Sequence, residues 1–257
     1  MTDPSSRNIV WITGASSGIG RALALRIARD GWTVAATARS QDDLDTLADE
    51  AGPVTGRIVA FPGDVADENA MRDLVARMEF ELGPIDLAVL NAGTHQPVSA
   101  LELEPGDFRK LIEINFLGTV NCLAALVPGM AARHSGQIAL VGSVAGYCGL
   151  PTSAAYGASK AALINMAEAL KPELDAAGIR LQLVNPGFVR TPLTDRNQFP
   201  MPFLMEVDDA AEAFWRGLQS NRFEIVFPRR LGWILKLMRL LPYPLFFGAT
   251  RRMVPGN

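Results

Sequence analysis

A tyrosine and a lysine four residues apart, Tyr156 and Lys160, are the residues of this sequence best suited to exchange a proton. If their segment is helical, the two side chains share one face, and the lysine ammonium lies beside the tyrosine phenol. A free phenol has a pKa of about 10, and a nearby cation favours the phenolate and lowers that pKa toward the working range. The same spacing occurs in helices without any such role, so the surrounding elements must support the interpretation.

The composition limits what this chain can be. Its 257 residues, 49% hydrophobic and 20% charged, can bury a full core within one domain. The formal net charge of -3 gives no reason to expect a nucleic-acid partner. Two cysteines and two histidines without ligand spacing predict no metal site, no disulfide framework and no Ser-His-Asp triad. The polar start from Met1 to Asn8 predicts no targeting peptide, and we expect a cytoplasmic protein.

Short apolar runs alternate with longer segments of helical period along the chain. Strands that are apolar throughout and separated by helices predict a parallel sheet covered on both faces. We therefore expect an α/β fold, a Rossmann-type doubly wound parallel sheet with three α/β/α layers. It forms a single domain over residues 1–228, to which residues 229–257 add a C-terminal amphipathic extension. The expected strands span residues 9–13, 33–37, 57–61, 85–90, 137–141, 179–184 and 223–227, and the expected helices span 20–29, 41–51, 68–82, 105–132, 156–176 and 208–219.

A glycine-rich turn joins the first expected strand to the first expected helix. Glycines permit a tight turn and a close approach of backbone to ligand, while the helix presents free N–H groups and its positive dipole end to a pyrophosphate. This position in the chain favours dinucleotide binding over a turn that is packed closely for structural reasons alone. The candidate cofactor-binding residues of the turn are Gly14, Ser16, Ser17, Gly18, Ile19 and Gly20.

The end of the second expected strand indicates which cofactor is used. An acidic side chain there would accept hydrogen bonds from the adenosine ribose, whereas Arg39 could pair with a 2'-phosphate. Arg39 therefore favours NADP(H), with NAD(H) and a merely solvated arginine as the alternatives. Asp42 and Asp43 follow closely, and we interpret them as first-turn residues of the next helix, placed for its dipole.

Together these features resemble the short-chain dehydrogenase/reductase family, in its compact single-domain branch. The resemblance covers nearly the whole chain up to Phe227 and lies in several motifs that occur in order. Besides the glycine turn, the matching residues are Asp64 and Val65 for adenine contact, Asn91, Ala92 and Gly93 after the fourth strand, Asn115, Ser143, Tyr156 and Lys160 at the catalytic positions, and Pro186, Gly187, Val189 and Thr191 at the nicotinamide carboxamide.

The resemblance implies that hydride passes between a nicotinamide and a carbonyl or alcohol carbon, with Tyr156 as general acid/base and Ser143 positioning the oxygen. Lys160 would bind the nicotinamide ribose and lower the Tyr156 pKa, and the backbone around Asn115 would order a water that links Lys160 to solvent. Taken singly, Ser143 could be a strand-end cap, Asn115 a polar residue inside a helix and Lys160 a solvated charge. Convergence of all four at one crevice favours the catalytic interpretation.

The stretch after Thr191 occupies the position of the family's mobile substrate loop. Its apolar side chains would either form a lid over a hydrophobic substrate or pack on the core, and both alternatives stay open. They belong to Leu193, Phe199, Pro200, Met201, Pro202, Phe203, Leu204 and Met205. We also expect Tyr147, Cys148 and Leu150 to line the pocket, and no Arg or Lys in that stretch favours an anionic head group.

The C-terminal segment after Phe227 is both basic and apolar. It carries six cations and no Asp or Glu, so it resembles an interfacial segment that lies on an anionic membrane. The alternative is a C-terminal helix that packs across the pocket or a subunit interface. The cations are Arg229, Arg230, Lys236, Arg239, Arg251 and Arg252, and the apolar residues include Leu231, Trp233, Ile234, Leu235, Leu237, Met238, Leu240, Leu241, Phe246 and Phe247.

Two functions of different classes are consistent with this sequence. The first is an NADP(H)-dependent reductase or dehydrogenase of a small hydrophobic carbonyl or alcohol substrate, acting in the cytoplasm or peripherally at the inner face of a membrane. The second is a non-catalytic NADP(H)-binding sensor or membrane scaffold on the same fold, against which the intact set of catalytic residues argues. The resemblance also implies a homodimer or homotetramer formed through the helices near residues 105–132 and 153–176.

Overall fold

The computed structural model describes residues 8–196 and 201–254. Within them, seven strands form one parallel sheet in the order β3-β2-β1-β4-β5-β6-β7. The order reverses between β1 and β4, so the doubly wound sheet predicted from the sequence is confirmed. The strands are β1 (Ile9–Thr13), β2 (Thr33–Thr37), β3 (Arg57–Ala60), β4 (Leu87–Leu90), β5 (Gly136–Val141), β6 (Ile179–Pro186) and β7 (Glu224–Phe227).

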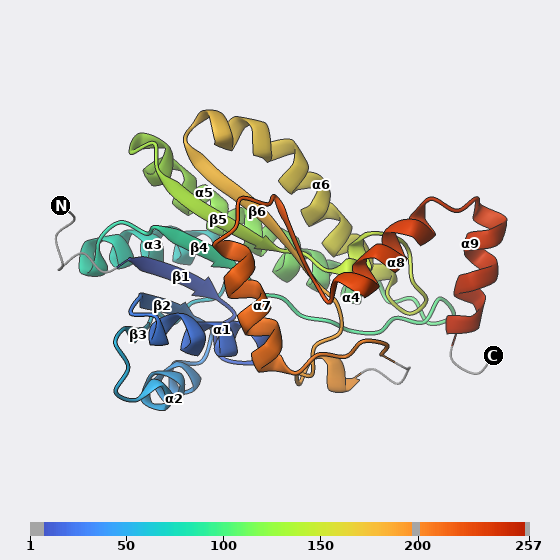
Figure 1. Cartoon of the computed structure of the whole chain (residues 1–257), viewed down its shortest axis with the longest axis horizontal. Helices are drawn as coiled ribbons and strands as arrows, with labels where there is room; N and C mark the ends of the chain where they lie inside the picture. Colours follow the sequence, from blue (N-terminus) through green and yellow to red (C-terminus); the bar gives the residue numbers. More distant parts are fainter. Residues whose placement is uncertain (1–7, 197–200, 255–257) are drawn as a thin grey trace.

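Helices cover both faces of the sheet and complete the three layers (Figure 1). One face is covered by α1 (Gly18–Arg29), α2 (Gln41–Ala51) and α7 (Val207–Leu218). The other is covered by α3 (Glu68–Leu82), α5 (Gly118–Ala132) and α6 (Ala154–Ala176), with the shorter α4 (Pro105–Ile112) packed beside α6.

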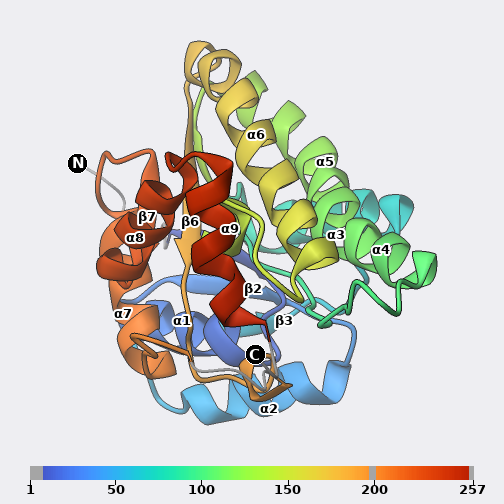
Figure 2. The ribbon, with the colours of Figure 1, turned by 90° about the vertical axis from the view of Figure 1, so that its right-hand side faces the viewer.

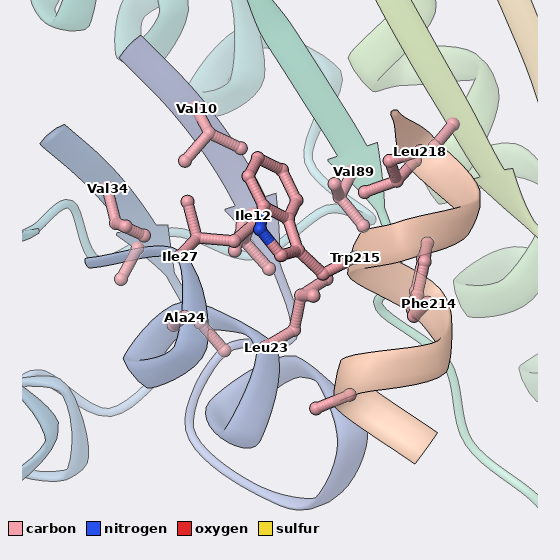
Figure 3. Packing of buried hydrophobic residues seen from close by; sticks show 14 of the residues in the cluster. Val10, Ile12, Leu23, Ala24, Ile27, Val34, Val89, Phe214, Trp215 and Leu218 are labelled. Carbon is pink, nitrogen blue, oxygen red and sulfur yellow. The ribbon is translucent and has the colours of Figure 1, made fainter. Parts of the chain in front are cut away.

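The two faces of β1 show why this sequence makes a sheet with a core on each side. Side chains alternate along a strand, so Val10 and Ile12 join the core under α1 and α7, while Ile9 and Trp11 join the core on the opposite face. Figure 3 shows the first of these cores, where the Trp215 indole of α7 lies close to side chains of α1 and β1. Because both faces are buried, the strand reads as apolar throughout.

The long helix predicted over residues 105–132 is continuous, and its middle differs from a regular α-helix. A π-helical segment, Glu113–Leu117, joins α4 to α5, and Asn115 lies buried within it. Such segments are frequent at functional sites because the extra residue per turn redirects a side chain. The whole stretch is long and apolar enough to cross a membrane by length and composition. Cys122, Leu126 and Met130 of α5 belong instead to the core beside the sheet, which accounts for part of this apolar character.

After β7 the chain adds α8 (Arg229–Arg239), α9 (Tyr243–Thr250) and a short 3₁₀ turn (Arg251–Met253). Figures 1 and 2 place both helices at the end of the molecule toward which the strands point. Leu231 and Leu235 of α8 and Phe246 of α9 form a small core with Val144 and Cys148, which follow β5. The extension therefore packs beside the carboxyl ends of the strands, where ligands bind in such sheets.

Candidate active site

The glycine-rich turn brings the end of β1, the start of α1 and the segment after β4 into contact. Gly14 has a φ of 67° and Gly18 a φ of 55°, left-handed values that favour glycine. A Cβ atom on Gly14 would lie 2.8 Å from the Ala92 Cα, and one on Gly20 would lie 2.3 Å from the Gly14 carbonyl oxygen. Side chains are thus excluded from the turn, which presents its backbone instead.

The start of α1 suits an anionic group. The helix begins at Gly18, two residues earlier than predicted, and its exposed N-cap Ser17 makes no side-chain hydrogen bond to the first turn. The first turn contains no acidic residue. Its N–H groups and positive dipole end therefore fit the phosphates of a dinucleotide, with Ser16 and Ile19 half-buried beside them.

Asn91 holds the glycine turn against the end of β4. Its side-chain amide donates to the carbonyl oxygens of Thr13, at 3.1 Å, and Gly14, at 3.3 Å. The Thr13 hydroxyl accepts from the backbone N–H groups of Asn91 and Ala92, each at 3.0 Å. The structure therefore brings Asn91 and Ala92 together with the glycine turn, as expected for residues under one bound cofactor.

Arg39 lies directly after β2 and is exposed. Ser40 follows it as the N-cap of α2, and its hydroxyl accepts from the Asp43 N–H at 3.2 Å. Asp42 and Asp43 lie in the first turn of α2, which confirms their interpretation as dipole partners of that helix. Because Asp42 and Asp43 belong to the start of α2, Arg39 is the charged side chain at the end of β2 that is placed to contact a ligand.

Asp64 and Val65 follow β3 at the same edge of the sheet. The Asp64 carboxylate accepts from the Ala66 N–H at 3.0 Å, which fixes the turn. Val65 is 6% exposed, and its carbonyl oxygen accepts from the Asn121 side chain of α5 at 2.9 Å. Both candidate adenine-contacting residues therefore sit on a rigid turn between β3 and α3.

Ser143 and Tyr156 meet beyond the carboxyl end of β5. Ser143 is buried, Tyr156 lies in the first turn of α6, and a hydrogen bond links the two side chains. The Ser143 hydroxyl also accepts from the Ala145 N–H at 3.1 Å and so caps the short 3₁₀ turn Val144–Gly146. Ser143 therefore acts as a cap and contacts the phenol as well.

Lys160 is not the solvated charge that was the alternative interpretation. It is 4% exposed, and its ammonium donates to the Val141 carbonyl oxygen at 2.7 Å. Its Nζ lies 5.8 Å from the centre of the Tyr156 ring, so the two residues share one helix face as predicted. Burial lowers the Lys160 pKa to about 8.

The expectation that Lys160 would lower the Tyr156 pKa is wrong for this structure. Burial raises the Tyr156 pKa above its ordinary value of 10.0, because the phenolate loses its hydration, and the hydrogen bond from Ser143 offsets only part of this. The phenol is therefore fully protonated at neutral pH. Tyr156 is held in the form that donates a proton.

Asn115 is fully buried and fixes the approach to Lys160. Its side-chain carbonyl accepts from the Thr94 N–H at 2.7 Å, and its amide donates to the Thr94 carbonyl and to the Ser159 hydroxyl, both at 3.0 Å. A Cβ on Gly93 would lie 3.2 Å from Asn115 Oδ1 and 3.5 Å from Lys160 Nζ. Gly93 therefore marks the point where Asn115 and Lys160 converge, and any larger residue would fill that space.

The candidate nicotinamide residues follow β6, which ends at Pro186 rather than at the predicted residue 184. The backbone N–H of Gly187 is already bonded to β7, and the Val189 side chain is 2% exposed within the core. Thr191 lies against the glycine turn, since its methyl carbon would be 3.2 Å from a Cβ on Gly18. The segment after β6 therefore lies in contact with the start of α1.

The side chains of Cys148 and Leu150 are covered by the C-terminal extension. They pack in one apolar cluster with Leu231, Leu235 and Phe246. Two residues predicted to line the pocket therefore pack against α8 and α9. Packing of the C-terminal helix across the pocket or a subunit interface stays a prediction.

Tyr147 brings cations of the extension next to that wall. Its hydroxyl donates to Glu224 at 2.7 Å, Glu224 also pairs with Lys236, and the Lys236 ammonium lies 5.1 Å from the Tyr147 ring centre. The Arg239 charge acts on Cys148, whose pKa is raised by burial. The stretch itself carries no Arg or Lys, as the sequence analysis noted, and the cations beside it come from residues distant in the sequence.

The substrate loop shows a mixed outcome within the described residues. Met205 pairs with Val189 and packs against the core, which follows the packing alternative. Phe203 is 43% exposed, as a lid residue would be. Phe199 and Pro200, also assigned to the lid, lie outside the described residues.

His95 is a site residue that the sequence reasoning missed. It is 8% exposed, and its ring meets the Tyr156 ring edge to face at a centroid distance of 4.7 Å. Its position two residues after Gly93 was the available signal. Thr94 and Ser159 were missed as well, because only the folded chain shows that they hold Asn115.

Comparisons with known proteins agree with this geometry. A sequence model described as short chain dehydrogenase matches residues 8–200. An uncharacterized oxidoreductase of Myxococcus xanthus is 39% identical over 242 residues, covering 94% of this chain and 96% of that protein. The 3-oxoacyl-[acyl-carrier-protein] reductase FabG of Thermotoga maritima is 36% identical over 188 residues, covering 73% of this chain and 76% of that protein.

Solved structures with bound cofactors share the fold. A short-chain dehydrogenase from Sphingobium yanoikuyae in complex with NADPH has a TM-score of 0.78 at 28% identity, covering 91% of this chain and 96% of that one. A short chain dehydrogenase from Mycobacterium paratuberculosis bound to NAD has a TM-score of 0.76 at 29% identity, covering 85% of this chain and 95% of that one. The chain belongs to the short-chain dehydrogenase family of NAD(P)-binding oxidoreductases.

Proposed function

We propose that this protein is an NADP(H)-dependent oxidoreductase that transfers a hydride between the nicotinamide and the carbonyl or alcohol carbon of a hydrophobic substrate. The observation that carries the proposal is the convergence of Ser143, Tyr156 and Lys160, with Asn115 behind them, at the carboxyl edge of the sheet. A binding module would need the glycine turn but would have no use for a buried phenol linked to a serine. The family assignment supports the same reaction class.

Tyr156 supplies the proton that carbonyl reduction requires at oxygen. Its raised pKa keeps the phenol protonated at neutral pH, and the hydrogen bond to Ser143 orients it. Ser143 can donate to the same substrate oxygen. A bound nicotinamide would supply the hydride for reduction or accept it for oxidation. In the oxidative direction Tyr156 takes the proton back, so that direction should require a higher pH.

Lys160 and Asn115 support this proton exchange. The buried Lys160 ammonium stands beside the Tyr156 ring, and its pKa of about 8 leaves most of it charged at neutral pH. Asn115 holds Thr94 and Ser159, and the Ser159 hydroxyl donates to the Tyr156 carbonyl oxygen at 2.7 Å. These bonds fix α6 against the segment after β4 and so fix the distance between the acid and the cofactor crevice.

Apolar surroundings support a hydrophobic substrate. The Tyr156 ring packs against a cluster formed by Val98, Leu111 and Ala155, with Phe108 beside it. On the other side of Ser143, Phe188 and Leu150 belong to the cluster under the C-terminal extension. The name of the Thermotoga maritima relative specifies a 3-oxoacyl reductase, which supports a ketone as the reacting group. Burial of a ligand's apolar surface would contribute about 25 cal/mol per Å².

The test is oxidation of NADPH by the purified chain with a panel of aliphatic, aromatic and fused-ring ketones. We expect turnover with at least one apolar ketone and none with small charged ketones. Cofactor binding by fluorescence without turnover of any panel member would instead favour the non-catalytic NADP(H)-binding sensor or scaffold. A panel of matching alcohols with NADP⁺ at alkaline pH covers the reverse direction.

Replacing Arg39 tests the cofactor preference. In Arg39→Ala we expect NADPH to bind about tenfold more weakly, because one charge-assisted contact to the 2'-phosphate contributes about 1.5 kcal/mol. NADH affinity should change by less than about twofold, since NADH lacks that phosphate. Dissociation constants for both cofactors, measured by titration, check this. An equal loss for both cofactors, or for neither, would contradict the assignment of Arg39.

A further inference from the structure

The helix α8 has two apolar faces, and only one of them is covered. Leu231 and Leu235 point into the small core beside Cys148. The opposite face carries Trp233 and Leu237, one turn apart, and Leu240 and Leu241 follow in the turn after the helix. Trp233 is 67% exposed and Leu240 is 80% exposed. A helix that needed only to pack on the domain would be polar on this second face.

The exposed apolar surface continues onto α9. Tyr243, Leu245 and Phe247 are all more than half exposed. Tyr243 and Phe247 stack on each other with ring centroids 5.5 Å apart. We call the exposed apolar residues of α8, α9 and the turn between them the C-terminal apolar surface: Trp233, Ile234, Leu237, Leu240, Leu241, Tyr243, Leu245 and Phe247. Large apolar side chains exposed together on two consecutive helices point to an interaction site.

The charges around this surface are all positive within the extension. Arg229 and Arg230 occupy the first turn of α8, where the helix dipole is positive and no acidic residue is present to complement it. Both are exposed, as are Arg239, Arg251 and Arg252. Lys236 differs from these arginines because its charge is paired with the Glu224 carboxylate. The segment thus combines an electrostatically unfavourable helix start with an uncovered apolar face, so a partner with both anionic and apolar groups would complement both features.

A groove between α7, β7 and α8 adds to the positive charge beside the apolar surface. It has a volume of about 830 Å³ and is lined by four cations, Arg216, Arg222, Arg229 and Lys236, and by one carboxylate, Glu224, which pairs with Lys236. Trp233 lines the groove and also belongs to the C-terminal apolar surface. Cationic and apolar groups are therefore adjacent on one side of the molecule rather than scattered.

We propose that the C-terminal apolar surface docks on an anionic phospholipid bilayer, with its aromatic and leucine side chains in the headgroup region and its arginines on the lipid phosphates. Basic charge flanking an exposed aromatic and leucine-rich helix face is the pattern of interfacial helices. A second copy of the chain is a poorer occupant. A twofold contact through this surface would bring two sets of arginines together, and residues 229–257 contain no Asp or Glu to neutralise them.

Docking in this orientation would also bring the active site close to the bilayer. The covered face of α8 packs on Val144 and Cys148, in the loop that begins at Ser143. If the proposed function is correct, a hydrophobic substrate could therefore pass from the bilayer to Tyr156 over a short path. This consequence rests on the proposed function, whereas the docking itself does not.

The docking is tested with the full chain, without cofactor or substrate, so its result is independent of turnover. The protein is floated with vesicles of phosphatidylcholine alone and of phosphatidylcholine mixed with phosphatidylglycerol. We expect binding to the mixed vesicles, weakened by added salt. Arg229→Gln/Arg230→Gln should weaken binding about thirtyfold, because each cation near an anionic surface contributes about 1 kcal/mol. Trp233→Ser/Leu237→Ser should weaken it at least about tenfold.

Matched substitutions elsewhere provide the controls. Phe80→Ser/Leu101→Ser removes two apolar side chains that are 91% and 95% exposed, and Arg29→Gln/Arg57→Gln removes two exposed arginines far from α8. Both control pairs should bind vesicles like the parent chain, and thermal denaturation shows that each variant is folded. Absence of binding to phosphatidylglycerol vesicles, or equal loss in the control pairs, overturns the proposal. So does a finding that Trp233→Ser/Leu237→Ser changes only the sedimentation mass, since the surface would then join two copies.

Discussion

Substitution of Tyr156 by phenylalanine should lower kcat by about 10²- to 10⁴-fold, the usual contribution of a positioned general acid. The variant removes one oxygen atom and keeps the ring, which packs against His95 and the Val98 cluster. NADPH affinity should therefore change little. The free energy of unfolding should change by no more than about 1 kcal/mol, because a single hydrogen bond to Ser143 is lost. Steady-state kinetics and cofactor titration measure the two effects separately.

The chain contains a matched control for this substitution. Tyr243 is 65% exposed on α9 and far from Ser143 in the sequence, so Tyr243→Phe should leave turnover unchanged. If Tyr156→Phe kept more than about a tenth of the parent kcat, proton donation by Tyr156 would be untenable, since even a weak general acid contributes more. The same would follow if Tyr243→Phe lost as much activity as Tyr156→Phe.

Replacing Lys160 with methionine should stabilise the fold while it lowers activity. The Lys160 pKa is about 8 in the folded chain and 10.5 as its ordinary value, because burial disfavours the ammonium. At neutral pH this burial costs about 3 kcal/mol of stability, which the substitution would recover. The substitution also removes the hydrogen bond to Val141, and this loss reduces the gain by about 1 kcal/mol. Lys160→Met should therefore raise the free energy of unfolding by about 2 kcal/mol at pH 7. Turnover should fall about 10²-fold with the loss of the charge beside Tyr156.

The pH dependence of this gain follows from the direction of the pKa shift. A lysine with a lowered folded-state pKa binds fewer protons in the folded than in the unfolded chain between about pH 8 and 10.5. Parent stability therefore rises with pH through this window, and the advantage of Lys160→Met should shrink there and disappear above it. Urea unfolding of both proteins at several pH values measures the difference.

Lys171 lies on the same helix and serves as the control for Lys160. It is partly exposed and pairs with Asp175 at the surface, so Lys171→Met should change stability by no more than about 0.5 kcal/mol. It should also leave turnover intact. If Lys160→Met were destabilising at neutral pH, the buried ammonium would be better compensated than its single bond to Val141 indicates.

Glu224 connects the C-terminal extension to the loop after Ser143. Its carboxylate accepts from the Tyr147 hydroxyl at 2.7 Å and from the Asn185 amide at 2.9 Å, and it pairs with Lys236 of α8. Burial raises the pKa of the Tyr147 phenol well above its ordinary value, and the carboxylate raises it further, so Tyr147 stays protonated as a donor. The position of α8, and with it any membrane contact, is thereby linked to one wall of the active site.

The sheet and most of the candidate site could be predicted from local features of the sequence. Apolar runs such as Ile9–Thr13 predict strands buried on both faces, and glycines with a helix directly behind them predict a phosphate turn. The spacing of Tyr156 and Lys160 likewise placed both on one helix face. These predictions succeed because strand period, helix period and turn chemistry depend on residues close together in the chain.

The tertiary structure decided the surroundings of individual side chains, whereas the helices and strands could be predicted from the sequence. The Tyr156 pKa is raised and the Lys160 ammonium is buried because many distant residues together remove water from them, and no spacing pattern encodes that sum. Lys236 reaches Tyr147 only through the fold, although 89 positions separate them in the chain. The basic apolar tail was visible in the sequence. Only packing could show which face of α8 is covered, because the sequence places apolar residues on both of its sides.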